Sequence, residues 1–449
     1  MNAVSAREPA RIEFIAPPPA AQRLRADLCV VGAGAAGVSA AVEAGRRGLR
    51  VVLVDGLPQI GGQSVNGLIG TLCGFFSTGA APHQLTYGFA GDVLDDLARA
   101  GALSWRPGRG SFVGLYDEHE LAASYARHLG TAGVTVVLGA LLVRVDREPH
   151  REDRGADSRI ARVELQTRHG PLSVEAATYV DASGDAALAA LAGATLQQAD
   201  APVYGTSMFS ITGLGAAVPA RAEVVGRLEQ VAERYGLARR DGFVFAFPGR
   251  DLCLVNLTHA RTPLDAVAMS RASLQARESI DAVMAFLRGE FPDAFGAARV
   301  LSVGQPGVRQ TRGVAARRTL TTAEVRAGAR PDDAIGRCAW PIEFHGSEEG
   351  VYWETFADGH ITWIPLLSMV SRDLRNLMAA GRCVDAEPFA LGAVRVIGPC
   401  MAMGAAAATA AGVAGADLHS MDVARVQALV ADNLDRADPA EARTGGLPA

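Results

Sequence analysis

The sequence predicts an α/β protein in which a Rossmann-like nucleotide-binding domain is divided by an inserted α+β domain. Three observations support this fold class. A strand, a glycine turn, a helix and a second strand follow one another over residues 27–55, short strands separated by helices begin near residue 201, and an Ala/Gly-rich helix follows the last predicted strand. A chain of 449 residues with 49% hydrophobic content is long enough for two or three domains.

Each part of segment 27–55 has a physical role in binding a dinucleotide. The turn reads Gly32-Ala33-Gly34-Ala35-Ala36-Gly37. Gly32 permits the tight turn, Gly34 lets the backbone approach a pyrophosphate, and Gly37 lets the helix pack on the strand. Free N–H groups at the start of that helix face the phosphates, and Asp55 stands where an acid binds the ribose. The flanking strand, helix and acid favour dinucleotide binding over a chance glycine turn.

The composition excludes several classes of partner. The 43 basic and 48 acidic residues give a net charge of −5, which argues against nucleic acid. Six dispersed cysteines form no CxxC pair and no zinc spacing, so we expect no metal site and reduced thiols in a cytoplasmic protein. Residues 1–24 predict a flexible tail rather than a signal peptide. The uncharged stretch 396–416 is mostly Ala and Gly and predicts a buried helix rather than a membrane span.

Between residues 56 and 200 the predicted elements continue the first domain. The loop containing Gly61, Gly62, Gln63 and Ser64 can press its backbone against a ligand, although a surface loop is the alternative. Helices are predicted over 92–100 and 118–132, a turn at 108–110, and strands over 134–138, 160–166 and 172–174. The segment 179–185 is a strand ending in a small-residue turn, and Asp181 and Asp185 either cap it or contact a cofactor.

From residue 201 the pattern predicts a second domain. Strands are expected over 208–212, 243–247 and 252–257, with helices over 222–235 and 270–288. A partial glycine motif at 213–218 lacks the third glycine and a following acid, and we discount it as a pyridine-nucleotide site. Four clustered arginines form either a solvated face or a carboxylate-recognition site: Arg309, Arg312, Arg317 and Arg318.

The segments after the arginine cluster are aromatic-rich and then rich in small residues. Trp340, Glu343, His345, Trp353 and His360 indicate either a hairpin packed on the core or a substrate-facing wall. A strand over 376–382 ends in glycine. The following helix, predicted over 400–413, consists of small residues, so another helix or a ring system packs very close to it.

These motifs resemble the FAD-dependent oxidoreductases of the glutathione-reductase-like flavoprotein superfamily, distantly related to fumarate reductase and succinate dehydrogenase flavoproteins. The resemblance rests on the glycine turn, the 61–62 loop, the 179–185 turn, segments 308–312 and 340–345, and segment 376–404. It implies FAD as cofactor, with the start of the last helix, near 397–401, facing the pyrimidine edge of the flavin. The implied FAD-binding residues are Gly32, Gly34, Ala35, Ala36, Gly37, Asp55, Gly61, Gly62, Gln63, Ser64, Ala182, Gly184, Asp185, Gly381, Arg382, Cys400 and Met401.

The resemblance also implies a domain plan. After the tail 1–24, residues 25–200 and 365–435 form the FAD-binding domain, residues 201–364 form the substrate or cap domain, and residues 436–449 form a second flexible tail. Two departures stand out: Asp55 replaces the glutamate of many relatives, and Gln310-Thr311 replaces an acid and a small residue. His83 and Cys73 are the candidates for covalent flavin attachment, although core packing explains both better.

The implied reaction is dehydrogenation, in which a small organic substrate bearing a carboxylate or an amine gives a hydride to flavin N5. His345 is the candidate base, with a structural histidine as the alternative. Arg395 is the candidate ligand of a substrate carboxylate or of a flavin oxygen, with Arg309 or Arg312 as the second choice. A flavin monooxygenase is the second hypothesis, but no second nucleotide fingerprint is present and the closing motif is Gly381-Arg382-Cys383. A non-catalytic FAD-binding protein is the third. The electron acceptor and the oligomeric state, a homo-oligomer included, are left open, and no membrane partner is expected.

Overall fold

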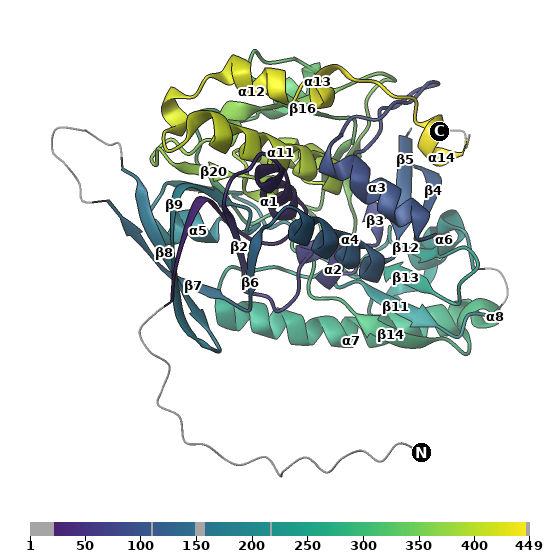
Figure 1. The fold of residues 1–449 in the computed structure, drawn as a ribbon. Coiled ribbons are helices and arrows are strands. Elements are labelled where there is room, and N and C mark those ends of the chain that lie inside the picture. The colour runs from purple at the N-terminus through teal and green to yellow at the C-terminus, as the bar shows by residue number, and fades with distance from the viewer. Residues whose placement is uncertain (1–21, 109–110, 149–157, 216–217, 446–449) are drawn as a thin grey trace, which may run out of the picture.

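A seven-stranded sheet forms the centre of the computed structural model, which describes residues 22–108, 111–148, 158–215 and 218–445 (Figure 1). Its parallel strands are β6 (Thr135–Leu138), β2 (Val51–Asp55), β1 (Gln22–Val31) and β9 (Gly170–Asp181), in that order, with β20 (Leu377–Ala379) beside the end of β9. Two antiparallel strands extend it, β8 (Ile160–Thr167) and β7 (Leu141–Arg147). The predicted strand-turn-helix-strand unit is confirmed, because β1 and β2 are adjacent and parallel.

Strand β9 joins two segments that the sequence predicts as separate strands. Its first half pairs with β8, and its last three residues, Tyr179–Asp181, pair with β20. Along its whole length β9 also lies beside β1, with Asp181 opposite Val31. The turn after Asp181 therefore opens at the same sheet edge as the glycine turn, because parallel strands end together.

Two helices pack closely on this sheet edge, α1 (Ala35–Arg46) and α11 (Ile397–Ala414) (Figure 1). A Cβ atom on Gly404 of α11 would lie 2.3 Å from the carbonyl oxygen of Ala36, and Ser39 donates a hydrogen bond to the Met401 carbonyl at 2.7 Å. The predicted close partner of the Ala/Gly-rich helix is thus another helix. α11 is long and apolar enough to cross a membrane, but 83% of it is buried in the protein, as expected for a core helix.

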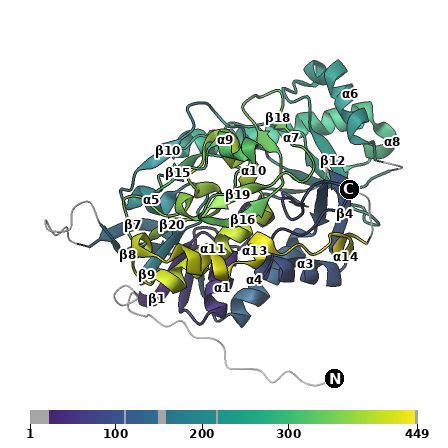
Figure 2. The ribbon, with the colours of Figure 1, turned by 90° about the horizontal axis from the view of Figure 1, so that it is seen from above.

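The inserted unit has an apolar core of its own. Its antiparallel sheet has the order β12 (Phe243–Ala246), β13 (Cys253–Asn256), β11 (Phe209–Thr212) and β14 (Arg299–Val303). The helices α6 (Arg221–Val231), α7 (Ala266–Glu290) and α8 (Pro292–Phe295) cover it. Both views place α6 and α8 at the end of the molecule opposite β7 and β8 (Figures 1 and 2). This core covers only residues 209–303, so the domain boundaries at 201 and 364 stay predictions.

Short sheets and helices connect the two units. The sheets are β3 (Thr71–Leu72) with β5 (Ser111–Tyr116) and β4 (Leu103–Gly108), β10 (Leu196–Gln198) with β15 (Arg312–Val314), β16 (Ala334–Cys338) with β19 (Thr362–Pro365), and β17 (Ile342–Phe344) with β18 (Tyr352–Glu354). The remaining α-helices are α2 (Gly62–Asn66), α3 (Phe89–Arg99), α4 (Glu118–Thr131), α5 (Ala187–Leu191), α9 (Thr322–Ala327), α10 (Pro388–Val394), α12 (Val423–Leu429), α13 (Asp432–Asp435) and α14 (Glu441–Thr444). The predicted helices 92–100 and 118–132 are confirmed as α3 and α4.

The chain ends differ from the predicted tails. Residues 22–24 belong to β1, and residues 1–21 lie outside the described residues. The prediction of a flexible tail from 436 is wrong for residues 436–445, because Ala440 N donates to the Pro82 carbonyl and Arg443 pairs with Asp95 at 2.5 Å. Backbone pairing of this kind is not visible in a polar, proline-bearing sequence. Residues 109–110 of the predicted turn, and 216–217 of the discounted glycine motif, also lie outside the described residues.

A buried carboxyl at the start of α4 makes stability depend on pH. Glu118 Oε1 is buried without a hydrogen-bond partner among the described residues, and burial raises the pKa of Glu118 to about 7. The raised pKa favours folding at pH values below the unfolded pKa, and this advantage is lost as the pH rises toward 7. We expect Glu118→Gln to raise the free energy of unfolding at pH 8 by about 1 to 3 kcal/mol. Urea unfolding at pH 8 and at pH 4.5 measures this, and an equal gain at both values would contradict it.

Candidate functional site

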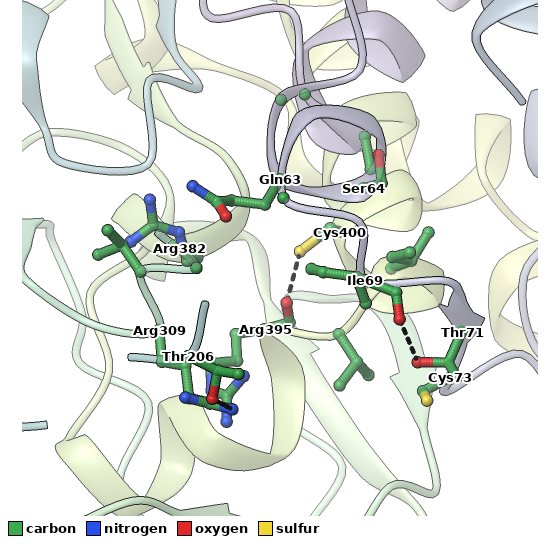
Figure 3. A pocket seen from close by; sticks show the side chains of 18 of the residues that line it. Gln63, Ser64, Ile69, Thr71, Cys73, Thr206, Arg309, Arg382, Arg395 and Cys400 are labelled. Atoms are coloured by element: carbon green, nitrogen blue, oxygen red, sulfur yellow. Dashed lines mark hydrogen bonds between the residues drawn. The ribbon is translucent and has the colours of Figure 1, made fainter. Parts of the chain in front are cut away.

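One large cavity, of about 650 Å³, is lined both by the central sheet edge and by the inserted unit (Figure 3). At one end it reaches the glycine turn, and most of the predicted FAD-binding residues line it there: Gly32, Gly34, Ala35, Ala36, Asp55, Gly62, Gln63, Ser64, Ala182, Gly184, Asp185, Gly381, Arg382 and Cys400. The fold therefore brings together motifs that are more than 300 residues apart in the chain, from Gly32 to Cys400.

Three predicted FAD-binding residues do not line the cavity but shape it. A Cβ atom on Gly37 would lie 1.8 Å from the Gly32 carbonyl oxygen, so Gly37 serves the close packing of α1 on the turn. Gly61 has a φ angle of +102° and donates its N–H to the Ala33 carbonyl at 2.7 Å. Met401 is buried, and its carbonyl accepts the hydrogen bond from Ser39. For these three residues the direct cofactor contact predicted from the sequence has no support from their position.

The glycine turn presents unpaired backbone donors to the cavity. α1 begins after Gly34 with no side-chain cap and no acid in its first turn. A Cβ atom on Gly62 would lie 2.8 Å from the Cα atom of Gly34, so two glycine-containing segments approach closely here. Asp55 accepts hydrogen bonds from Ala33 N at 2.6 Å and Leu57 N at 2.7 Å, which fixes its carboxylate at the cavity wall.

The two aspartates of the 179–185 turn have different roles. Asp181 is fully buried and accepts hydrogen bonds from Ser183 and from Ala189 N, so it is a capping residue. Asp185 lines the cavity and accepts hydrogen bonds from Thr311 Oγ1 at 2.6 Å and from Arg382 at 3.4 Å. The unusual Thr311 therefore orients this acid. Cys383 of the closing motif lies beneath the turn and accepts from Gly184 N at 3.1 Å.

A second helix begins at the cavity. Val396, Ile397 and Cys400 line it at the start of α11, which has no side-chain cap. A Cβ atom on Gly398 would lie 2.5 Å from the Gly74 carbonyl oxygen, so the 73–75 segment packs directly against this helix start. The positive end of the α11 dipole therefore faces the cavity and stabilises negative charge there.

A sequence profile described as FAD dependent oxidoreductase matches residues 27–430. The chain belongs to this family of FAD-dependent oxidoreductases. The predicted fold class, with a Rossmann-like FAD-binding domain, and the predicted cofactor are confirmed.

Several solved structures are similar to this FAD-dependent oxidoreductase at low sequence identity. A geranylgeranyl bacteriochlorophyll reductase-like protein from Thermoplasma acidophilum is 12% identical, with a TM-score of 0.48 over 92% of this chain and 85% of that one. A triple mutant of the flavin-dependent brominase Bmp2 is 14% identical, with a TM-score of 0.47 over 91% and 84%. The p-nitrophenol 4-monooxygenase PnpA from Pseudomonas putida DLL-E4 is 12% identical, with a TM-score of 0.43 over 92% and 82%. No curated protein matches the sequence.

The residues at the glycine-turn end fit FAD. The unpaired N–H groups at the start of α1 would hold its pyrophosphate, and Asp55 would bind its ribose. Gln63 lines the same wall, and its buried Oε1 atom has no hydrogen-bond partner among the described residues. Of the two candidates for covalent attachment, Cys73 lines the cavity as a thiol whose pKa is raised by burial to about 12. His83 does not line it and is bonded to Ser77.

The other end of the cavity is a chamber of charged and aromatic side chains. Five arginines and two carboxylates line it, Arg106, Arg221, Arg239, Arg309, Arg395, Asp241 and Glu343, together with the aromatic residues Trp340, Trp353, Phe243 and Phe245. The interpretation of this aromatic-rich segment as a substrate-facing wall agrees with the positions of Trp340 and Trp353, whereas Trp363 does not line the cavity. His360 lies elsewhere, bonded to the Val325 carbonyl at 2.8 Å.

The predicted arginine cluster is split by the fold. Arg309 lines the chamber and donates to Tyr204 O at 2.8 Å and Thr206 Oγ1 at 2.6 Å (Figure 3). Arg312 lies outside the large cavity, where its Nε donates to the Asp185 carbonyl at 3.0 Å. Arg317 bonds to His419 O, and Arg318 pairs with Asp333. The position of Arg312 gives no support to its predicted role as a substrate ligand.

His345 lies behind the chamber wall and not on it. Its side chain is 1% exposed, and its Nε2 is 2.8 Å from Glu343 Oε1, the carboxylate that does line the chamber. On the other side its Nδ1 is 3.1 Å from His259 Nε2, and His259 Nδ1 is 2.9 Å from the Glu348 carbonyl oxygen. We call these four groups the Glu343–His259 array. The sequence predicted His345 and not Glu343 as the base, because residues two apart in an extended segment share a face and the sequence does not show which of the two reaches the cavity.

Electrostatics keep the array deprotonated at neutral pH. Burial lowers the pKa of His345 to about 2, with Arg309 acting in the same direction, and burial lowers the pKa of His259 to about 3. Burial opposes ionisation of Glu343, but Arg395 and His345 hold the pKa of that carboxyl well below its usual range. The chamber therefore contains an ionised carboxylate backed by two neutral imidazoles.

Proposed function

We propose that this FAD-dependent oxidoreductase is a dehydrogenase of small organic acids. When bound, FAD supplies the hydride acceptor. The substrate carboxylate binds at Arg309 and Arg395, and the substrate proton goes to Glu343. The observation that carries the proposal is the Glu343–His259 array, which opens into the same chamber as these arginines.

The carboxylate site is argued from the pairing of the arginines. Arg309 has only neutral partners, Tyr204 O and Thr206 Oγ1, so its charge is uncompensated by a direct ion pair among the described residues. Arg395 forms an ion pair with Glu343, in which Arg395 Nη2 lies 3.6 Å from Glu343 Oε2. A guanidinium that lines a cavity without its own carboxylate is suited to bind one from the substrate.

The base is argued from a count of hydrogen atoms in the array. In the deprotonated form His345 donates to Glu343 and His259 Nε2 donates to His345, which leaves no hydrogen between His259 Nδ1 and the Glu348 carbonyl. One added proton completes all three hydrogen bonds. A proton that enters at Glu343 can thus move through His345 and leave at His259, which is partly exposed. The Arg309 and Arg395 charges lower the pKa values of Glu343 and His345, and a substrate carboxylate bound at these arginines offsets that effect.

An anaerobic stopped-flow screen tests the proposal. The purified protein with FAD is mixed with pooled hydroxy acids, amino acids, amines and NAD(P)H, and the visible absorbance of the oxidised cofactor is followed. Bleaching by an organic acid is the expected result. Bleaching by NAD(P)H alone, or incorporation of isotope from labelled oxygen into the product, would overturn the dehydrogenase in favour of a reductase or monooxygenase, and no bleaching by any compound would favour a non-catalytic role.

A further inference from the structure

Two arginines of the chamber lie over a pair of neighbouring aromatic rings. The guanidinium carbon of Arg106, on β4, is 4.0 Å from the centroid of the Phe245 ring. That of Arg221, at the start of α6, is 5.3 Å from the centroid of Phe243. The two rings are themselves 4.4 Å apart, and all four side chains line the cavity. Two cations are thus held over neighbouring aromatic faces, which stabilise them but leave their hydrogen-bond donors available.

The hydrogen-bond partners of this pair differ from those of the other chamber arginines. Arg239 pairs with Asp241 at 2.9 Å, and Arg395 pairs with Glu343. Among the described residues no carboxylate pairs with Arg106, and its buried Nε has no hydrogen-bond partner. Within the described part of the chain, the one hydrogen bond of the Arg221 side chain goes to the backbone carbonyl of Asp241, at 3.4 Å.

The positive charges of Arg106 and Arg221 repel each other, and this repulsion raises the free energy of the chamber. Burial lowers the pKa of Arg106 to about 10, and the charge of Arg221 acts in the same direction, yet Arg106 remains a cation at neutral pH. An anion that bridges the two guanidinium groups with charge-assisted hydrogen bonds offsets this repulsion.

An aromatic strip separates this pair from the proposed base. Trp340 donates its indole N–H to Glu343 at 3.2 Å, and its ring centroid is 6.1 Å from that of Trp353. Both tryptophans belong to one apolar cluster with Val113, which is paired with Arg106 across β4 and β5. A substrate that reaches from Glu343 to Arg106 therefore crosses an apolar wall.

We propose that Arg106 and Arg221 form a second anion subsite, so that the substrate is an organic acid with a second acidic group, a carboxylate or a phosphate, at the far end of an apolar or aromatic body. This inference rests on the proposed function, because the first acidic group is the one at Arg309 and Arg395. It adds the substrate class, a dianion, to the reaction.

Calorimetric titration of the FAD-loaded protein with simple probes tests the subsite. Benzoate and biphenyl-4-carboxylate carry one acidic group. Terephthalate, biphenyl-4,4′-dicarboxylate and 4-carboxyphenyl phosphate carry two. We expect at least one of the dianions to bind about 10- to 100-fold more tightly than its single-acid counterpart. The carboxylate and phosphate probes distinguish the two chemistries of the second group.

Substitutions then locate the effect. We expect Arg106→Gln and Arg221→Gln to remove the advantage of the dianion while leaving benzoate affinity unchanged, and Arg106→Lys to keep part of it. Arg25→Gln, a surface control whose side chain is 81% exposed, should change neither. Equal affinity for one-acid and two-acid probes in the wild type, or an unchanged advantage in both Gln variants, would overturn the subsite. Dianion binding that depends on Arg106 in a protein that no organic acid reduces would uphold the subsite and reject the dehydrogenase.

Discussion

The variant Glu343→Gln is expected to slow anaerobic reduction of the bound FAD by its substrate about 10²- to 10⁴-fold, the range of a lost general base. The amide keeps the shape of the carboxylate and can still accept the hydrogen bond of Trp340, and Arg395 keeps its hydrogen bond to the backbone carbonyl of residue 343. It cannot take up a proton, so the array loses its entry point at the chamber. The measurement is single-turnover stopped-flow reduction with the acid identified by the screen.

Two further variants separate proton transfer from positioning. His259→Phe keeps a ring against Tyr204, whose ring centroid is 6.0 Å away, but removes the exit end of the array. It should slow reduction less than Glu343→Gln and should change the solvent isotope effect on the rate. Glu349→Gln changes a residue on the exposed loop beside the array, and the FAD bound to this variant should be reduced at the wild-type rate. If the FAD bound to Glu343→Gln were reduced at the wild-type rate, another group would have to accept the proton.

The nucleotide half of the fold was predictable because it depends on local rules. Gly32 and Gly37 are required by a turn and by a close helix contact, and the acid predicted after the second strand lines the cavity. The small residues of α11 predicted a close neighbour for the same reason. Such features have a short sequence span or a strict steric requirement, so they can be read from one chain.

The chamber was less predictable because its residues meet only in three dimensions. Arg106 stands on a strand of the first half, Arg221 and Arg239 stand in the inserted unit, and no spacing links them. Arg309 and Arg312 show the opposite failure, since they are close in sequence and diverge in space. His345 was predicted as the base, but Glu343 lines the chamber, and His345, which directly follows strand β17, is buried behind that carboxylate.

The contact between α1 and α11 connects the two halves of the FAD-binding domain, and we expect Gly404→Val to disrupt it. A Cβ atom at Gly404 would lie 2.3 Å from the Ala36 carbonyl oxygen and 2.7 Å from Ser39 Cβ. The first is a backbone atom of the helix that carries the glycine turn, so it cannot move aside without displacing that turn. We expect a loss of about 3 kcal/mol in the free energy of unfolding, at the upper end of overpacking effects. Urea denaturation and the FAD content of the purified protein measure both consequences.

The same helix supplies a matched control. A Cβ atom on Gly412 of α11 would meet nothing within 4 Å, so Gly412→Ala adds a side chain without a clash. Because alanine favours a helix over glycine, this variant should gain up to about 1 kcal/mol and keep full FAD content. If Gly404→Val were as stable as Gly412→Ala and retained FAD, the close approach of α1 and α11 would not be what holds the glycine turn. Loss of FAD only in Gly404→Val would tie cofactor binding to this helix contact, because both variants enlarge a glycine of the same helix and only one meets the backbone of α1.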